Sequence, residues 1–203
     1  MPIFIENEEQ RSPGWFKTKA GIPSASRFAD IITTQGKQST ARMKYLYTLT
    51  GEKLLGTKEE EYQSTAMLRG VELEESAREY YSFITGNEVK QVGFCFPDKK
   101  KRYGCSSDGL VGKDGMVEIK CRNLSNHIAS LLSKKLKSPD YQQVQGQLLV
   151  TSRKWIDYLC YYPGLPHLLI RVFPDKEFQK KLKNELIIFC DELNDITNKL
   201  KEK

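Results

Sequence analysis

The sequence predicts a mixed α/β fold in which a central β-sheet lies between helices. Up to Gly86 the apolar residues recur every three or four positions, as in amphipathic helices, and after it the spacing changes to two, as in strands. Helical spacing returns after Cys121 and again after residue 174. Helices therefore flank the strand-forming segments in the chain, and this order is typical of a sheet covered by helices. The sequence has no internal repeat, linker or low-complexity tract, so we expect one domain over residues 1–203.

The expected helices have recognisable ends. A short helix from about residue 25 follows Pro23 and Ser24, which favour a helix start. A longer helix ends at Gly86, because glycine readily takes the left-handed conformation that closes a helix. Another has Pro139 near its first turn. After the short first helix, the expected helices span residues 40–55, 61–86, 125–136, 139–151 and 175–200.

The expected strands form a three-strand meander followed by a pair, over residues 88–96, 102–111, 116–121, 155–163 and 168–173. A three-residue loop, Lys113-Asp114-Gly115, would join the second strand to the third and end in a left-handed glycine. That loop would pair Asp108 with Lys120. Asp108, Glu118 and Lys120 would then share one face of the sheet, because side chains alternate along a strand.

A further acidic residue lies in the core-facing stripe of the helix over 61–86. Glu74 shares this mainly apolar stripe with Ala77 and Tyr81, whereas the neighbouring glutamates fall on another side. A buried carboxylate without a partner is costly, and a metal ion would be a suitable partner. Mg²⁺ prefers carboxylate oxygens, so three acids beside a lysine suggest a site for hydrolysis of phosphate esters. The structural alternative is a hairpin salt bridge from Asp108 to Lys120, with Glu118 in solvent.

Composition narrows the partners and the compartment. The net charge of +6, with a pI near 8.9, gives mild support to an anionic partner. The sequence has no segment typical of a signal peptide or a membrane span, so we expect no membrane partner. The five cysteines are widely spread and form no CxxC pair, which argues against a zinc ribbon or a disulfide framework. We expect reduced thiols and a cytoplasmic location.

Four motifs resemble one family of nucleases. The stretch SSDGLVGKDGMVEIKC resembles the core of the PD-(D/E)XK nucleases, an aspartate and a hairpin followed by Glu-x-Lys. The stretches WFKTKAGIPSASRF, RGVELEESAR and YQQVQGQLLVT resemble the signatures of the lambda exonuclease (YqaJ-type viral recombinase) family within that superfamily. The four motifs follow in order from about residue 15 to residue 151. The resemblance implies a restriction-endonuclease-like three-layer sandwich, a central mixed sheet flanked by helices.

The resemblance also implies an activity. It indicates an alkaline exonuclease that needs Mg²⁺, with Mn²⁺ as a substitute. Such an enzyme degrades one strand of linear double-stranded DNA from its 5′ end and leaves 3′ overhangs for phage-type recombination by strand annealing. The implied partners are DNA ends and a single-strand annealing protein, with a homotrimeric ring as a possible assembly. If the chain is phage-encoded, the compartment is the cytoplasm of the bacterial host.

The family's functional residues can be carried over by position. Metal ligands would be Asp108, Glu118, the carbonyl of Ile119 and Glu74. Lys120 would serve the attacking nucleophile, and Gln143 would orient Lys120 or the scissile phosphate. The terminal 5′-phosphate would be held by Lys19, Ser24 and Ser26, although Lys19 stands where the family has arginine. Trp15 would stack on a DNA end or anchor the core, and Met67 would wedge between the strands or pack.

Two other functions remain open at this point. The first is a nuclease with the same chemistry and another substrate or polarity, acting as an endonuclease or on single-stranded or branched DNA. The second is a module that binds DNA ends without cutting them. The complete set of Asp108, Glu118, Lys120 and Glu74 argues against a site that has lost its activity.

Overall fold

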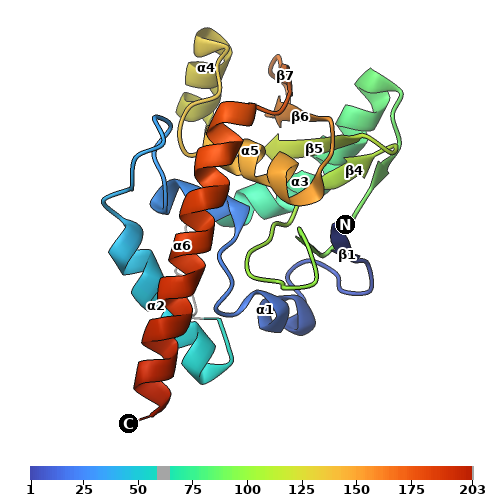
Figure 1. Ribbon diagram of the computed structural model, residues 1–203. Helices are drawn as coiled ribbons and strands as arrows, with labels where there is room; N and C mark the ends of the chain where they lie inside the picture. The colour runs from blue at the N-terminus through green and yellow to red at the C-terminus, as the bar shows by residue number, and fades with distance from the viewer. Residues whose placement is uncertain (59–64, 203) are drawn as a thin grey trace.

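The computed structural model describes the backbone of residues 1–58 and 65–202, and the side chains of all of these except residues 65–67. Figure 1 shows a twisted sheet with a helix on each face and a long C-terminal helix along the outside of the molecule. The helices are α1 (Pro13–Lys19), α2 (Arg42–Leu55), α3 (Thr65–Thr85), α4 (Leu124–Ser133), α5 (Asp140–Thr151) and α6 (Lys176–Lys201), with a 3₁₀ helix η1 (Ala25–Asp30). No helix in the described ranges is both long enough and apolar enough to cross a membrane.

The main sheet has five strands in the order β2-β4-β5-β6-β7. The strands are β2 (Val89–Lys90), β4 (Gly109–Val111), β5 (Gly115–Lys120), β6 (Trp155–Cys160) and β7 (Leu168–Val172). β5 and β6 are parallel, and the other neighbouring pairs are antiparallel, so the sheet is mixed. A parallel pair needs a crossover connection. Here α4 and α5 supply that connection between β5 and β6.

Each face of the sheet buries its own apolar cluster. On one face, α3 packs against the strands in a cluster made of Ala77, Tyr81, Val111, Val117, Ile119 and Leu159. On the opposite face, α5 contributes Val144 and Leu148 to a cluster with Leu110, Met116 and Ile156. β5 therefore directs Val117 and Ile119 toward α3, and Met116, Glu118 and Lys120 toward α5. The expected three-layer sandwich, with a central mixed sheet between helices, is confirmed.

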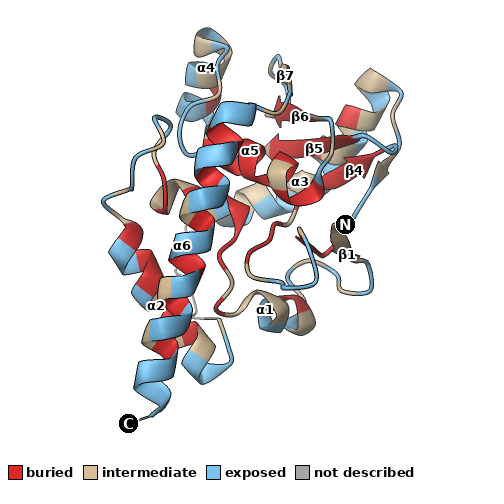
Figure 2. Cartoon of the chain, viewed as in Figure 1, coloured by how far each residue is buried: buried red, intermediate tan, exposed pale blue. Residues whose placement is uncertain are grey.

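A second apolar layer lies outside α5. Residues of η1, α2, α5 and α6 form a cluster that includes Phe28, Leu46, Val150, Leu182 and Phe189. Figure 2 shows the consequence for α6, where buried and exposed residues alternate in stripes along the helix, as an amphipathic surface helix requires. The side chain of Asp175 caps the start of α6, accepting from Phe178 N at 3.0 Å.

The meander differs from the expected three strands. The segment over 88–96 is divided into β2 and β3 (Phe94–Phe96), and β3 pairs with an unexpected strand, β1 (Ile3–Ile5), in a separate two-stranded sheet. The N-terminal segment causes this division by crossing the chain at Gly93. A Cβ atom at Gly93 would lie 2.1 Å from the carbonyl oxygen of Glu8, and Trp15 Nε1 donates to Gly93 O at 3.1 Å.

The hairpin between β4 and β5 is shifted by two residues from the expected register. Leu110 pairs with Met116, and the turn consists of Gly112, Lys113 and Asp114. Gly112 takes the positive φ of +53° that was expected at Gly115. Gly115 meets a different constraint, because a Cβ there would lie 2.1 Å from the Trp155 ring. A shift of two preserves the alternation of faces, so the expected grouping of side chains survives the error.

Candidate active site

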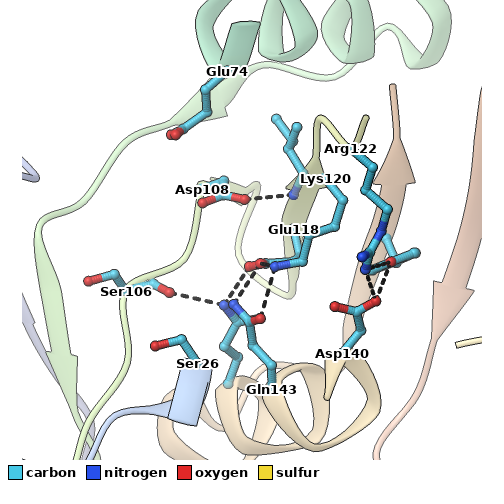
Figure 3. A network of polar contacts seen from close by, with 12 residues as sticks. Ser26, Glu74, Ser106, Asp108, Glu118, Lys120, Arg122, Asp140 and Gln143 are labelled. Carbon is cyan, nitrogen blue, oxygen red and sulfur yellow. Dashed lines mark hydrogen bonds and ion pairs between the residues drawn. The ribbon is translucent and has the colours of Figure 1, made fainter. Parts of the chain in front are cut away.

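The carboxylate of Glu118 is the centre of a buried polar network on the α5 side of the sheet. Its Oε1 accepts from Gln143 Nε2 at 2.6 Å and from Lys120 Nζ at 2.7 Å. Its Oε2 accepts from Gln147 Nε2 at 2.6 Å. Figure 3 shows Gln143 reaching from α5 toward Glu118 on the strand above it. Because Glu118 is only 2% exposed, these contacts hold a charged group out of water in a fixed orientation.

Lys120 is held by two acceptors. Its ammonium donates to Glu118 Oε1 and to Gln143 Oε1, the latter at 2.9 Å. An ammonium group has three protons, and the described residues accept two of them. The third can be donated to a water or to a phosphate oxygen. Burial lowers the pKa of Lys120, but the carboxylates of Glu118 and Asp108 outweigh it and raise the pKa above its ordinary value. Lys120 is therefore a cation beside the carboxylates.

Asp108 lies just before β4 and points toward β5. Its Oδ2 accepts from the backbone N–H of Ile119 at 2.6 Å. Burial raises the pKa of Asp108 well above its ordinary range, and the charges of Glu118 and Glu74 raise it further. Asp108 is thus near enough to Glu118 and to Glu74 for both to oppose its negative charge, and a cation beside Asp108 would relieve that repulsion.

Glu74 approaches from α3, on the opposite side of the sheet from α5 (Figure 3). Its Oε1 accepts from Arg78 Nη2 at 3.0 Å and its Oε2 accepts from Arg11 Nη2 at 2.7 Å. The expectation of a partner for this carboxylate is met, although here the partners are two arginines. One of them, Arg11, comes from the N-terminal segment, whose position the sequence did not predict.

The salt-bridge alternative does not describe this geometry. Lys120 pairs with Glu118, and Asp108 is occupied by the Ile119 amide. The side chain of Glu118 is 3% exposed, so it is not in solvent. Glu118 is thus a buried acid among polar side chains.

The donor set suits a hard divalent cation. Within the described ranges, no three His, Cys, Asp or Glu side chains are close enough together to hold an ion, and Glu74 is paired with two arginines. Asp108 and Glu118 remain, with the Ile119 backbone between them. Two carboxylates and a carbonyl are oxygen donors of the kind Mg²⁺ takes while it keeps several waters. The residues present therefore fit such an ion.

The residues expected to hold a 5′-phosphate line one small cavity. Lys19, Ser24 and Ser26 surround a space of about 70 Å³ together with Arg27 and Tyr45. The hydroxyl oxygens of Ser24 and Ser26 lie 3.2 Å apart. Arg27 was not expected from the sequence, and its guanidinium carbon lies 4.6 Å from the centre of the Tyr45 ring. Lys58 and the carboxylate of Glu52 also line the cavity, so three cations and two hydroxyl groups outweigh one acid, and this set suits an anion.

Trp15 has the position of an anchor. The residue is 8% exposed, and its Nε1 donates to Gly93 O and to Ser106 Oγ, the latter at 3.0 Å. The ammonium of Lys19 lies 3.9 Å from the ring centre. Trp15 therefore links the N-terminal segment to the chain leading to Asp108, which favours the core-anchoring alternative. Met67 belongs to α3, but its side chain is outside the described set.

Besides Arg11 and Arg27, sequence reasoning missed Gln147 and Arg78. Gln147 follows Gln143 by one helical turn, so the spacing in YQQVQGQLLVT already puts both on one face of α5. Arg78 follows Glu74 by the same spacing and donates from Nε to the backbone oxygen of Asp108 at 3.2 Å. The helical spacing was thus a usable signal in both cases.

The domain model of the YqaJ-like viral recombinases matches residues 14–154, more than half of the chain. The chain belongs to the YqaJ-like viral recombinase family. The prediction of a nuclease is confirmed: this YqaJ-like chain is a DNA exonuclease and hence a hydrolase, in a family that uses divalent metal ions. A search of curated proteins found no significant match.

Solved structures agree with this assignment. The alkaline exonuclease LHK-Exo from Laribacter hongkongensis is 34% identical to the YqaJ-like chain. The match has a TM-score of 0.86 and covers 94% of this chain and 97% of that one. A second structure, LHK-Exo in complex with dAMP, matches with the same values. A phage-related exonuclease from Haemophilus somnus shares the fold at 15% identity, with a TM-score of 0.70 over 88% of this chain and 96% of that one.

Proposed function

We propose that the chain is a Mg²⁺-dependent exonuclease that degrades one strand of linear double-stranded DNA from the 5′ end and leaves a 3′ overhang. The observation that carries this proposal is the coexistence of two features. One is the cluster of Asp108, Glu118 and Lys120, and the other is the separate cavity lined by Lys19 and two serines. An enzyme that acts on ends needs both a reaction centre and a place for the terminal phosphate.

The residues of the reaction centre have separate roles in this proposal. Asp108, Glu118 and the Ile119 carbonyl hold the ion, and Glu74 assists. A bound Mg²⁺ would supply polarisation of the scissile phosphoryl group and a bound water of lowered pKa. Lys120 donates to the attacking water or to a phosphoryl oxygen, which stabilises the negative charge that develops there. Gln143 fixes the ammonium of Lys120 through its amide oxygen.

The cavity would read the terminal phosphate. Lys19 supplies charge and the hydroxyl groups of Ser24 and Ser26 supply hydrogen bonds. LHK-Exo has been solved in complex with dAMP, so a protein of this fold binds a nucleoside monophosphate. We further propose one domain over residues 1–203, an annealing protein as partner, a homotrimeric ring, and action in the cytoplasm.

Digestion of end-labelled DNA tests the proposal. Blunt linear duplex, circular duplex and single-stranded DNA are incubated with Mg²⁺, with Mn²⁺ or with a chelator. We expect loss of the 5′ label from linear duplex before the 3′ label, in either metal and not with the chelator. Cleavage of the circle would indicate an endonuclease, prior loss of the 3′ label would reverse the polarity, and binding without cleavage would leave only an end-binding module.

A further inference from the structure

Arg78 contacts three separate parts of the chain around the acidic cluster. Its Nη2 donates to Glu74 Oε1 at 3.0 Å, and its Nε donates to the backbone oxygen of Asp108 at 3.2 Å. When the side-chain amide of Gln91 is oriented with its oxygen toward Arg78, Gln91 Oε1 accepts from Nη1 and Nη2 at 2.7 Å each. All three guanidinium nitrogens are therefore engaged.

These contacts join elements that lie apart in the sequence. Glu74 and Arg78 belong to α3, Gln91 lies between β2 and β3, and Asp108 precedes β4. The side chain of Arg78 is 14% exposed, so its hydrogen bonds are shielded from competing water. The guanidinium thus fixes the distance between the Glu74 carboxylate and the backbone that carries the Asp108 carboxylate.

We propose that Arg78 is a positioning residue that sets the affinity of the acidic cluster for its divalent cation, with Gln91 holding Arg78 in place. The inference rests on the proposed function, since it assumes that Asp108 and Glu118 bind the ion. Arg78 itself touches neither the ion nor the substrate. It acts by keeping Asp108 and Glu74 in the arrangement that accepts the ion.

The shape of the side chain matters as well as its charge. A guanidinium presents a planar fork of donors, whereas the ammonium of lysine is a single point of charge on a flexible stem. Lysine at position 78 would keep the charge near Glu74 but could not reach Glu74, Gln91 and the Asp108 carbonyl together. Removal of groups that orient metal ligands typically lowers metal affinity about 10–100-fold, and that is the effect we expect.

Arg11 provides an internal comparison. It donates to the other oxygen of Glu74, and that hydrogen bond is its link to the acidic cluster. Its side chain is 46% exposed, much more than that of Arg78. Arg11 and Arg78 thus bring equal charge to one carboxylate, and of the two only Arg78 also binds the Asp108 backbone. If positioning is the cause, loss of Arg11 will not weaken metal binding. If simple neutralisation of Glu74 is the cause, both losses will act alike.

The experiment measures Mn²⁺ binding to the full chain without DNA, from the electron paramagnetic resonance signal of free Mn²⁺. The variants are Arg78→Lys, Gln91→Ala and Arg11→Ala. The matched control is Arg171→Lys, because Arg171 also pairs with a carboxylate, that of Asp157, but does so on β7. We expect Kd to rise about 10–100-fold for Arg78→Lys, less for Gln91→Ala, and not at all for Arg11→Ala or the control.

A second measurement separates positioning from substrate contact. The Mg²⁺ concentration that gives half-maximal cleavage should rise with Kd in Arg78→Lys, while the rate at saturating Mg²⁺ recovers to within a few-fold of wild type. Unchanged metal affinity with a low saturating rate would overturn the proposal and make Arg78 a substrate contact. Equal weakening in Arg11→Ala would overturn it in favour of neutralisation.

Two further outcomes have fixed meanings. If Arg78→Lys does not fold, as judged by its circular dichroism, Gln91→Ala decides, and wild-type affinity there refutes the role of the bridge. If the wild-type protein itself neither binds Mn²⁺ nor cleaves with Mg²⁺, the proposed function fails together with this inference. If only the inference about Arg78 is wrong, the wild-type protein still binds Mn²⁺ and cleaves DNA with Mg²⁺.

Discussion

Gln147 on α5 donates from Nε2 to Glu118 Oε2 on β5 at 2.6 Å, and the same nitrogen donates to the backbone oxygen of Ser106 at 3.0 Å. One amide therefore links the helix, the strand and the segment that leads into Asp108. Both partners of this contact are buried, so water cannot replace it.

Replacement of Gln147 by alanine should destabilise the fold. The change leaves an oxygen of a buried carboxylate without its donor, a loss worth about 1–3 kcal/mol in unfolding free energy. The shift of the urea midpoint measures it. In a Glu118→Gln background the same change should cost less, because the oxygen left behind is neutral. Equal costs in the two backgrounds would show that the contact with the charge contributes nothing.

Glu118→Gln should abolish cleavage and leave DNA binding intact. The amide keeps the shape of the carboxylate but removes a hard anionic ligand, and the lysines and arginines that meet phosphate are unchanged. Gel-shift and digestion assays with the same duplex measure the two properties. Full activity of this variant in Mg²⁺ would refute Glu118 as a ligand.

Lys120→Ala should slow cleavage by roughly 10²–10³-fold, because it removes a cation aimed at the charge that develops in the transition state. The Kd for Mn²⁺ should not rise, since Lys120 is not a ligand. A loss of metal binding as large as the loss of rate would contradict the separate roles of Lys120 and Glu118.

Lys19→Ala should erase most of a preference for 5′-phosphorylated ends. A charge-assisted contact is worth roughly 1.5–3 kcal/mol, so wild type should digest a 5′-phosphate substrate about tenfold to a hundredfold faster than a 5′-hydroxyl substrate. The variant should be slow only on the phosphorylated one. Four rates, two proteins on two substrates at one salt concentration, decide the matter. If Lys19→Ala slows both substrates equally, the phosphate cavity is misplaced.

Asp175→Ala should lower stability at neutral pH and have a smaller effect in acid. Hydrogen bonds from the Phe178 backbone and the Tyr141 hydroxyl lower the pKa of Asp175, so its contribution is complete above the ordinary carboxyl pKa. It is lost as the pH falls through the lowered value. Loss of a helix cap costs about 1 kcal/mol. Urea unfolding of both proteins at pH 7 and near pH 3 should show the difference shrinking in acid.

The main sheet and its flanking helices could be predicted because their determinants are local. The change of apolar spacing after Gly86 located the end of α3, which is followed by that glycine at a φ of +67°. Alternation along residues 116–121 placed Glu118 and Lys120 on one face, and a two-residue error in the hairpin did not alter that. Face membership depends only on whether a residue number is odd or even within a strand.

The parts that could not be predicted depend on distant contacts. The division of 88–96 into two strands requires the N-terminal segment to cross at Gly93, and the pairing of Glu74 with Arg11 depends on the same segment. No local pattern encodes where residues 1–12 will pack. The expected helix over 61–86 is observed from Thr65 onward, and its first residues, 61–64, are outside the described ranges.

The parallel pairing of β5 with β6 has a consequence for the order of events during synthesis. Glu118 pairs with Tyr158, and the helix that supplies Gln143 and Gln147 lies between them in the chain. A nascent chain that has emerged only as far as β5 carries its acidic residues without the strand and helix that orient them. We therefore expect nuclease activity to begin only after β6 has left the ribosome.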